Sequence, residues 1–339
     1  MKLYADLFND IEIKAEIQTR AIDNELCPYT HRISPYVDLI DFQDCLIDFF
    51  RNFQVCENGM PLLRFLKTDW PFFNDSFVGF DSFLDALLRE LGFAFSSGTR
   101  VEYSDEIIEF VSSWSHLKSV LLHDRRFLLY ERETPMGTDW GASLRAAELP
   151  FPQNAEFYRA RIYYEARKDD YTLEEMKCPK HEDATEGRAN PAGIPVLYLC
   201  LEAETTAYEV KALNHDFISV ATFRVVSEDG ITLLDFSSRP NISLVSSTKS
   251  AIQSYLLHKA ISHDLSKPMR RDSKPYEYVP TQYLCEYIKH ELGVDGIIFN
   301  SSVCPDGHSV VVFHPEKLNP VKVTKWRVAK TDICLEPCV

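Results

Sequence analysis

The chain has 339 residues, which suits two domains, and its apolar fraction of 45% is ordinary for a globular protein. Its formal charge of −15 argues against a nucleic-acid partner, because phosphate contacts need clustered basic residues and the longest such cluster is Met269-Arg270-Arg271. A negatively charged nucleotide remains compatible with this charge, because a few local residues decide a single pocket.

The N-terminus shows no secretory signal, since no positively charged segment leads into an apolar stretch. No run approaches the roughly 20 apolar residues that a membrane helix needs. Nine irregularly spaced cysteines are typical of free thiols in a reducing compartment. We therefore expect a cytoplasmic protein without membrane contact.

Apolar residues at three- and four-residue steps predict helices in the first part of the chain, over residues 39–50, 80–93 and 105–130. Prolines interrupt this pattern, and Pro150-Phe151-Pro152 is the expected boundary. The sequence thus predicts a helical N-terminal domain over residues 1–150.

Strand and helix patterns alternate after this boundary. Strands are expected over residues 196–201, 217–226, 231–236, 297–299 and 310–313, and helices over 204–213 and 281–292. The first of these helices opens with a candidate capping threonine, and the second ends at Gly293. The predicted fold class is α+β, with a mixed domain over residues 151–320 and a tail over 321–339.

The sequence lacks the motifs of several common enzyme classes: it contains no G-x-x-x-x-G-K-[ST], G-x-G-x-x-G, H-E-x-x-H or G-x-S-x-G. Cys178 and His181 have metal-like spacing, as do Cys27 and His31, but each pair supplies only two of the ligands that a zinc site needs. We expect no metal, and interpret these residues as buried or loop side chains.

One constellation in the second half stands out. An arginine and two turn-forming Pro-Gly segments directly precede a predicted strand, in the run Gly187-Arg188-Ala189-Asn190-Pro191-Ala192-Gly193-Ile194-Pro195. A short helix carrying Glu209 follows, and far downstream Gly296-Ile297-Ile298-Phe299-Asn300-Ser301 leads to an apolar strand.

These blocks resemble the RES (Arg-Glu-Ser) family in order and spacing, over roughly residues 156–316. The family pattern has an aromatic-Arg start, a Gly-Arg-x-Asn-Pro-x-Gly segment, a strand ending near Tyr, a helix with Glu, and a late block ending in Ser. The matching residues here are Phe157-Tyr158-Arg159, Gly187 to Gly193, Tyr198, Glu209 and Ser301.

The resemblance implies a compact domain similar to ADP-ribosyltransferases. It implies NAD⁺ as the substrate, cleaved at the nicotinamide–ribose bond by phosphorolysis or hydrolysis, with inorganic phosphate as a co-substrate in the first case. It also implies a bacterial toxin or phage-defence effector, held in check by a helix-turn-helix antitoxin.

Cleavage of that bond builds oxocarbenium character on the ribose, which a nearby carboxylate stabilises most in the transition state. Glu209 is the candidate carboxylate, and Arg188 and Arg159 are candidates for the pyrophosphate. We rank Arg161 lower, on the expectation that it points away from Arg159. Tyr198 is expected to contact a ring or the ribose, and Ser301 a hydroxyl, a phosphate or the nucleophile, with Ser302 as its alternative.

Each of these residue types, taken singly, is more often a surface, turn or core residue; their common order favours the functional interpretation. Two alternatives stay open: an ADP-ribosyltransferase that modifies a macromolecule, and a non-catalytic interaction protein. Longer RES proteins often carry a helical extension that opens with Cys-x-x-Cys, and here Thr30 stands where the second cysteine would be. That extension is expected to serve partner binding, autoinhibition or homodimer formation.

Overall fold

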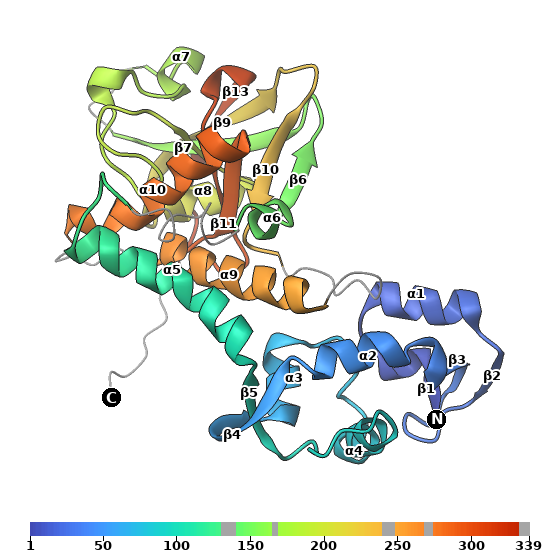
Figure 1. Cartoon of the computed structure of the whole chain (residues 1–339). Helices are drawn as coiled ribbons and strands as arrows, with labels where there is room; N and C mark the ends of the chain where they lie inside the picture. Colours follow the sequence, from blue (N-terminus) through green and yellow to red (C-terminus); the bar gives the residue numbers. More distant parts are fainter. Residues whose placement is uncertain (130–139, 165–168, 239–247, 268–273, 332–339) are drawn as a thin grey trace. The chain divides into compact units, whose positions relative to one another are not determined.

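The computed structural model describes residues 1–129, 140–164, 169–238, 248–267 and 274–331 (Figure 1). The chain forms two compact units, one from Met1–Ser112 with Pro240–Gln253 and the other from Ser113–Arg239 with Ser254–Val339. The expected single boundary near residue 150 therefore differs from the observed division, in which the chain passes between the units more than once.

The N-terminal unit contains strands as well as helices, which corrects the prediction of a helical domain. Its elements are β1 (Lys2–Tyr4), α1 (Ile11–Arg20), β2 (Asp23–Leu26), β3 (Ile33–Asp38), α2 (Gln43–Phe50), β4 (Phe53–Pro61), α3 (Leu62–Asp69), α4 (Phe80–Glu90), β5 (Arg100–Tyr103) and the start of α5 (Asp105–His123). Among the described residues, β1, β3 and β2 form one antiparallel sheet, and β4 pairs with β5.

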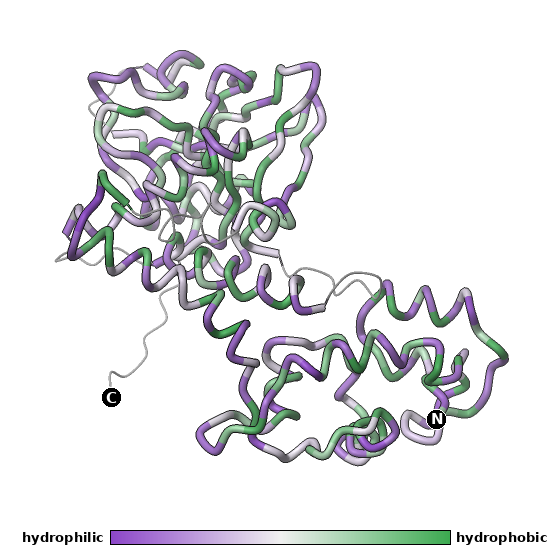
Figure 2. Tube along the Cα trace, in the orientation of Figure 1, coloured by the Kyte–Doolittle hydropathy of each residue, from purple (hydrophilic) through white to green (hydrophobic). Residues whose placement is uncertain are grey.

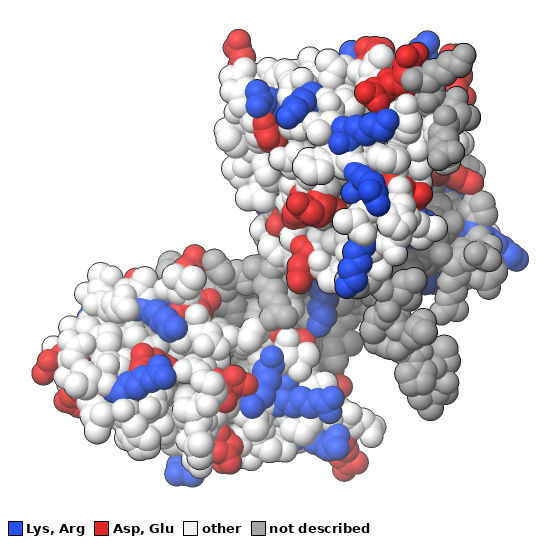
Figure 3. Space-filling model, turned by 180° about the vertical axis from the view of Figure 1, so that it is seen from behind, with Lys and Arg blue, Asp and Glu red and all other residues white. Residues whose placement is uncertain are grey.

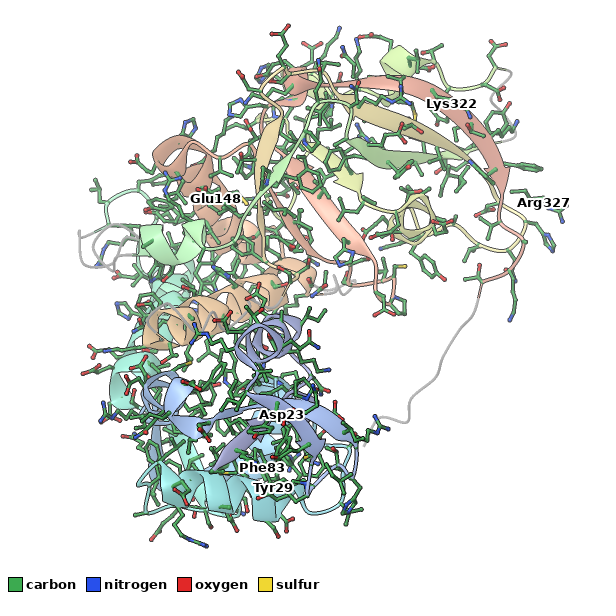
Figure 4. The ribbon with its side chains drawn as sticks, turned by 90° about the vertical axis from the view of Figure 1, so that its right-hand side faces the viewer. Asp23, Tyr29, Phe83, Glu148, Lys322 and Arg327 are labelled. Atoms are coloured by element: carbon green, nitrogen blue, oxygen red, sulfur yellow. The ribbon has the colours of Figure 1, made fainter. Side chains whose placement is uncertain are left out.

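Aromatic side chains fill the core of the N-terminal unit. The ring of Tyr29 meets that of Phe83 edge-on with centroids 5.1 Å apart (Figure 4), and Phe49 makes similar contacts with Trp70 and Phe72. Cys27 is fully buried beside this cluster, in agreement with its interpretation as a core thiol.

The start of α9 (Thr248–Ser266) belongs to the N-terminal unit because α2 holds it there. Oδ2 of Asp48 accepts hydrogen bonds from the Thr248 backbone N–H at 3.0 Å and from its hydroxyl at 2.5 Å. These bonds satisfy a backbone donor at the helix start. Because α5 and α9 each continue across the division between the units, no proline or loop marks these two crossings in the sequence, whereas the third crossing falls at Arg239-Pro240.

The C-terminal unit is built on one large sheet. Its elements are the rest of α5, then α6 (Trp140–Arg145), β6 (Glu148–Phe151), β7 (Glu156–Tyr163), α7 (Leu173–Met176), β8 (Leu197–Cys200), α8 (Ala203–Glu209), β9 (Phe217–Val225), β10 (Ile231–Asp235), the rest of α9, α10 (Val279–Tyr287), β11 (Gly296–Asn300), β12 (His308–Val312) and β13 (Leu318–Arg327). In the described part of the chain the strand order is β13-β9-β7-β8-β12-β11-β10-β6. Pairing is antiparallel except between β10 and β11.

Figure 4 marks the two edges of this sheet, with Glu148 on β6 and with Lys322 and Arg327 on β13. Strand β13 corrects the expected tail over residues 321–339, because it pairs with β9 along its whole length. Residues 332–339 lie outside the described part.

The two faces of the sheet bury different sets of residues. One face carries the main core, which includes Phe157, Leu199, Phe223 and Val312, and the central strands stand out as hydrophobic in Figure 2. On the other face α8 packs through its alanines on β7 and β9. This second face is where the candidate site lies.

The predicted strands of the second half are confirmed to within about one or two residues, and so is the fold class, α+β. Gly293 does end a helical segment, with φ of +66°. The capping threonine was wrong: Thr205 and Thr206 lie inside α8, and Glu202 occupies the N-cap position without a capping hydrogen bond.

No helix in the described residues has both the length and the apolar character needed to cross a bilayer. On the face seen in Figure 3, basic and acidic side chains are interspersed over the surface of each unit.

Buried His258 on α9 predicts an acid-sensitive fold. Its Nε2 lies 2.7 Å from the carbonyl of Ser143, and burial lowers its pKa to about 4, against the opposing effects of this bond and of Asp235. Because the unfolded chain binds the proton near pH 6.5, stability contributed by neutral His258 is present at pH 7 and is lost as the pH falls toward 4.

We expect the unfolding free energy of the wild type to fall between pH 7 and pH 5 by about 2 kcal/mol more than that of His258→Gln. Urea titrations at both pH values measure this difference, with the exposed His290→Gln as the matched control. If the unfolding free energy fell equally in the wild type and in His258→Gln, protonation of His258 would not be the cause of the acid sensitivity.

Candidate active site

A cavity of about 400 Å³ opens on the α8 face of the sheet. Its floor is a row of side chains paired in register across four strands, namely Phe299, Ser309, Cys200 and Tyr158. Arg188, Tyr198, Glu209 and Ser302 complete its walls together with Leu265 and Tyr278. Most of the residues that the sequence singled out therefore meet at one cavity.

The segment Gly187–Gly193 is a loop organised around one buried amide. Asn190 is only 3% exposed as a residue, and its Nδ2 donates to the carbonyls of Thr185, Pro191 and Ile194 at 2.9 to 3.1 Å. Its Oδ1 accepts a hydrogen bond of 2.9 Å from the Tyr198 hydroxyl. Asn190 thus fixes the loop that presents Arg188.

Side chains of helix α10 also hydrogen-bond to the backbone of this loop. Thr281 donates to the carbonyl of Arg188 at 2.6 Å, and Nε2 of Gln282 donates to the carbonyls of Gly187 and Asn190 at 2.8 and 3.0 Å. The backbone on both sides of Arg188 is therefore fixed before any ligand arrives, which is the preorganisation that a binding site needs.

Gly187 is required by this close packing. A Cβ atom there would lie 2.4 Å from the Tyr198 hydroxyl oxygen and 2.9 Å from Oδ1 of Asn190. We expect Gly187→Ala to lower the unfolding free energy by about 1–3 kcal/mol and to displace Arg188. Urea unfolding tests this, with Gly98→Ala as control, since nothing lies within 4 Å of a Cβ at Gly98; equal stability of the two variants would refute the close packing.

Arg188 is half-buried at the cavity. Its Nη1 donates to the backbone carbonyl of Asp264 at 3.1 Å, and its guanidinium lies 5.7 Å from the ring centre of Tyr278. Burial lowers the pKa of Arg188, while Tyr278, Tyr198 and Glu209 act in the opposite direction. Since an arginine stays charged at neutral pH, this group is a partly desolvated cation with donors left for a ligand.

Arg159 borders the cavity, but its guanidinium is directed elsewhere. Its Nη1 donates to the carbonyls of Met176 and Lys177 at 3.0 and 2.8 Å, on the opposite face of β7 from Tyr158. Burial and the charge of Arg161 lower the pKa of Arg159 to about 10. The structure therefore gives Arg188 a more direct place at the cavity than Arg159.

The expectation that Arg161 points away from Arg159 was wrong. Residues two apart on a strand share a face, and Nε of Arg161 donates to the carbonyl of Glu175, beside the carbonyls that Arg159 contacts. Both arginines thus bind the α7 segment to β7.

Glu209 is the last residue of α8, and its side chain is exposed toward the cavity. One oxygen, Oε1, accepts hydrogen bonds from the hydroxyls of Ser301 at 2.7 Å and Ser309 at 2.8 Å. A carboxylate at the carboxyl end of a helix meets the negative end of the helix dipole. The two hydroxyl donors offset that cost and orient the carboxylate, which leaves Oε2 without a hydrogen bond to any described residue.

Ser301 and Ser302 take different positions in the turn after β11. The hydroxyl of Ser301 accepts from the backbone N–H groups of Val303 and Cys304 at 3.3 and 3.2 Å while it donates to Glu209. Ser302 is exposed and lines the cavity itself. Ser301 therefore orients the Glu209 carboxylate, whereas Ser302 is the serine that a ligand in the cavity could contact.

Glu202 ties the start of α8 to β12. Its Oε2 accepts from the Thr205 hydroxyl at 2.9 Å and from the His308 backbone N–H at 3.0 Å, and Oε1 lies 2.7 Å from Nδ1 of His308. Burial alone would raise the pKa of Glu202, but these hydrogen bonds together lower it. The network fixes α8 against the strand that carries Ser309.

Tyr198 lines the cavity with its ring while its hydroxyl is engaged by Asn190 and by the backbone N–H of Ala189 at 3.1 Å. Burial raises the pKa of Tyr198, so its phenol stays protonated at neutral pH. Its hydroxyl is thus already used by the loop, and its ring is the part that faces a ligand.

Sequence reasoning missed Ser309 and Tyr278. Ser309 is only 7% exposed and stands at the start of an apolar strand. A polar residue beside such an apolar run could have indicated a functional side chain. Nothing in the local sequence distinguishes Tyr278, which reaches the cavity only because α10 packs on the Gly187–Gly193 loop.

A comparison with protein families matches residues 157–331, 175 of the 339 residues, to the model described as RES domain. No curated protein and no solved structure matches the chain. The expected similarity to the ADP-ribosyltransferase fold therefore stays a prediction.

Proposed function

Because this chain belongs to the RES domain family, we propose that it cleaves the nicotinamide–ribose bond of NAD⁺, with phosphate or water as the acceptor. One observation carries the proposal. A carboxylate oriented by two serine hydroxyls stands in the same cavity as a half-buried arginine.

The carboxylate supplies what this bond cleavage needs. As the bond breaks, its electron pair leaves with nicotinamide, which becomes neutral, and positive charge grows on the ribose. Glu209 is fixed in orientation before the reaction, so its negative charge stabilises the growing positive charge without reorganisation. No strong general acid is required, because the leaving group is already a good one.

Arg188 fits the other end of the substrate. A guanidinium binds phosphate oxygens through paired N–H donors, and the loop around Asn190 fixes its position. The ring of Tyr198 and the hydroxyl of Ser302 are available for the nicotinamide or the ribose. Arg159 would assist mainly by fixing β7.

The acceptor attacks the ribose carbon from which nicotinamide departs. Inorganic phosphate gives ADP-ribose 1-phosphate, and water gives ADP-ribose with release of a proton. We further propose that this NAD⁺ loss makes the protein a cytoplasmic bacterial toxin or defence effector controlled by an antitoxin. The family supports that role, and the seven cysteines among the described residues are all free, as in a reducing compartment.

Product analysis tests the proposal. The purified full chain is incubated with adenine-labelled NAD⁺, with and without phosphate, and the labelled products are separated. ADP-ribose or its 1-phosphate is the expected product. Label on protein or RNA would instead favour an ADP-ribosyltransferase, and unchanged NAD⁺ with folded protein in both conditions would favour a non-catalytic module.

A further inference from the structure

A second cavity, of about 360 Å³, lies in the C-terminal unit where the parallel strands β10 and β11 end beside α9. Residues on one face of α9 form one wall, and the turn after β10 and the end of β11 form the other. The lining residues that matter here are Ser238, Tyr255, Lys259, Ser262, His263 and Asn300.

Ser262 adds a polar group to the wall that α9 forms. The residue lines the cavity and is only 6% exposed. Its hydroxyl can donate a hydrogen bond to an acceptor group bound in the cavity.

The charges around the cavity favour an anion. Lys259 and His263 are one turn apart on α9 and both line it. Two carboxylates are adjacent in sequence to lining residues, and both are engaged. Asp235 Oδ1 accepts from the Ser237 N–H and hydroxyl at 2.8 and 2.5 Å and from the Ser238 N–H at 3.3 Å. Asp264 Oδ2 accepts from Nε1 of Trp114 at 2.7 Å and from Nζ of Lys118 at 2.6 Å. Hydroxyls combined with basic groups suit the oxygens of a phosphate group.

This cavity is separate from the reaction cavity but adjoins it. Leu265 and Phe299 line the reaction cavity, whereas the next residues in sequence, Ser266 and Asn300, line the second one. The Ser266 hydroxyl donates to the carbonyl of Asn300 at 2.5 Å, directly before the turn that carries Ser301.

We infer that this second cavity is a binding site for a phosphate group, distinct from the site of NAD⁺ cleavage. The group is that of inorganic phosphate or of a phosphate monoester. Binding is measured by calorimetry on the full chain carrying Glu209→Gln, titrated with inorganic phosphate, with AMP, and with adenosine as the ligand without phosphate. Because binding is read directly, the outcome does not depend on whether the protein cleaves NAD⁺.

Lys259→Gln, added to this background, is expected to weaken phosphate binding tenfold or more, and Ser262→Ala severalfold. Lys322→Gln, an exposed lysine on β13, is the matched control and is expected to leave the affinity unchanged. Urea unfolding of each variant checks that the fold is retained.

Tighter binding of AMP than of inorganic phosphate would identify a nucleotide as the source of the phosphate group, and equal binding would identify phosphate itself. Three results would overturn the inference. They are no binding of either probe, equal affinity in the parent and in both cavity variants, or loss of binding in Arg188→Gln alone, which would assign the phosphate to the reaction cavity.

Discussion

Replacing Glu209 by glutamine is expected to lower kcat for nicotinamide release by about 10²–10³-fold. The side-chain amide oxygen of glutamine can accept the same hydrogen bonds from Ser301 and Ser309, so the variant keeps the shape of the site and removes only the charge. KM is expected to change little, because the carboxylate acts on charge that appears in the transition state. Initial rates at saturating NAD⁺ measure the effect.

Glu204→Gln is the matched control for this substitution. Glu204 lies in the first turn of the same helix, is exposed, and does not line the cavity. It is expected to leave kcat unchanged. If Glu209→Gln retained the rate of the wild type, the carboxylate would have no part in the reaction.

Replacing Arg188 by glutamine is expected to lower kcat/KM by about 10- to 100-fold, because a charged hydrogen-bonding partner of the pyrophosphate is lost. Arg188→Lys is expected to recover only part of this loss, since lysine keeps the charge without the paired donors of the guanidinium. Steady-state kinetics over a range of NAD⁺ concentrations measure both variants.

Arg159→Gln separates this prediction from a general effect of removing positive charge. In the wild type the Arg159 guanidinium donates to the carbonyls of Met176 and Lys177. We therefore expect Arg159→Gln to lower the unfolding free energy and to change kcat/KM less than Arg188→Gln does. The assignment of Arg188 would be contradicted if Arg159→Gln lost more kcat/KM than Arg188→Gln while unfolding normally.

The sequence predicted the strands of the C-terminal unit well because their burial leaves a local mark. Val310, Val311 and Val312 form a short run of β-branched apolar residues that is typical of a buried strand, and β12 contains them. Helix α9 was missed, because buried His258 and Ser262 interrupt the apolar stripe that would have indicated it. The short strands of the N-terminal unit were missed for another reason: β2 reads Asp-Asn-Glu-Leu and becomes a strand only through its pairing with β3.

The candidate site could likewise be predicted only in part from the sequence. The order of the RES motifs along the chain identified Glu209 and Ser301, which are 92 positions apart and are joined by a hydrogen bond in the structure. Strand register decides the remaining details, since it brings Ser309 to Glu209 and turns Arg159 to the opposite face of β7. Register depends on long-range pairing, which a single sequence does not encode locally.

The central claim is that the protein cleaves the nicotinamide–ribose bond of NAD⁺, and the stoichiometry of the reaction tests this claim most directly. The purified full chain is mixed with NAD⁺, and the NAD⁺ consumed and the nicotinamide formed are quantified in the same samples. We predict one nicotinamide for each NAD⁺ lost, from the first turnovers onward. Loss of NAD⁺ without nicotinamide, or no loss at all with folded protein, would contradict the account.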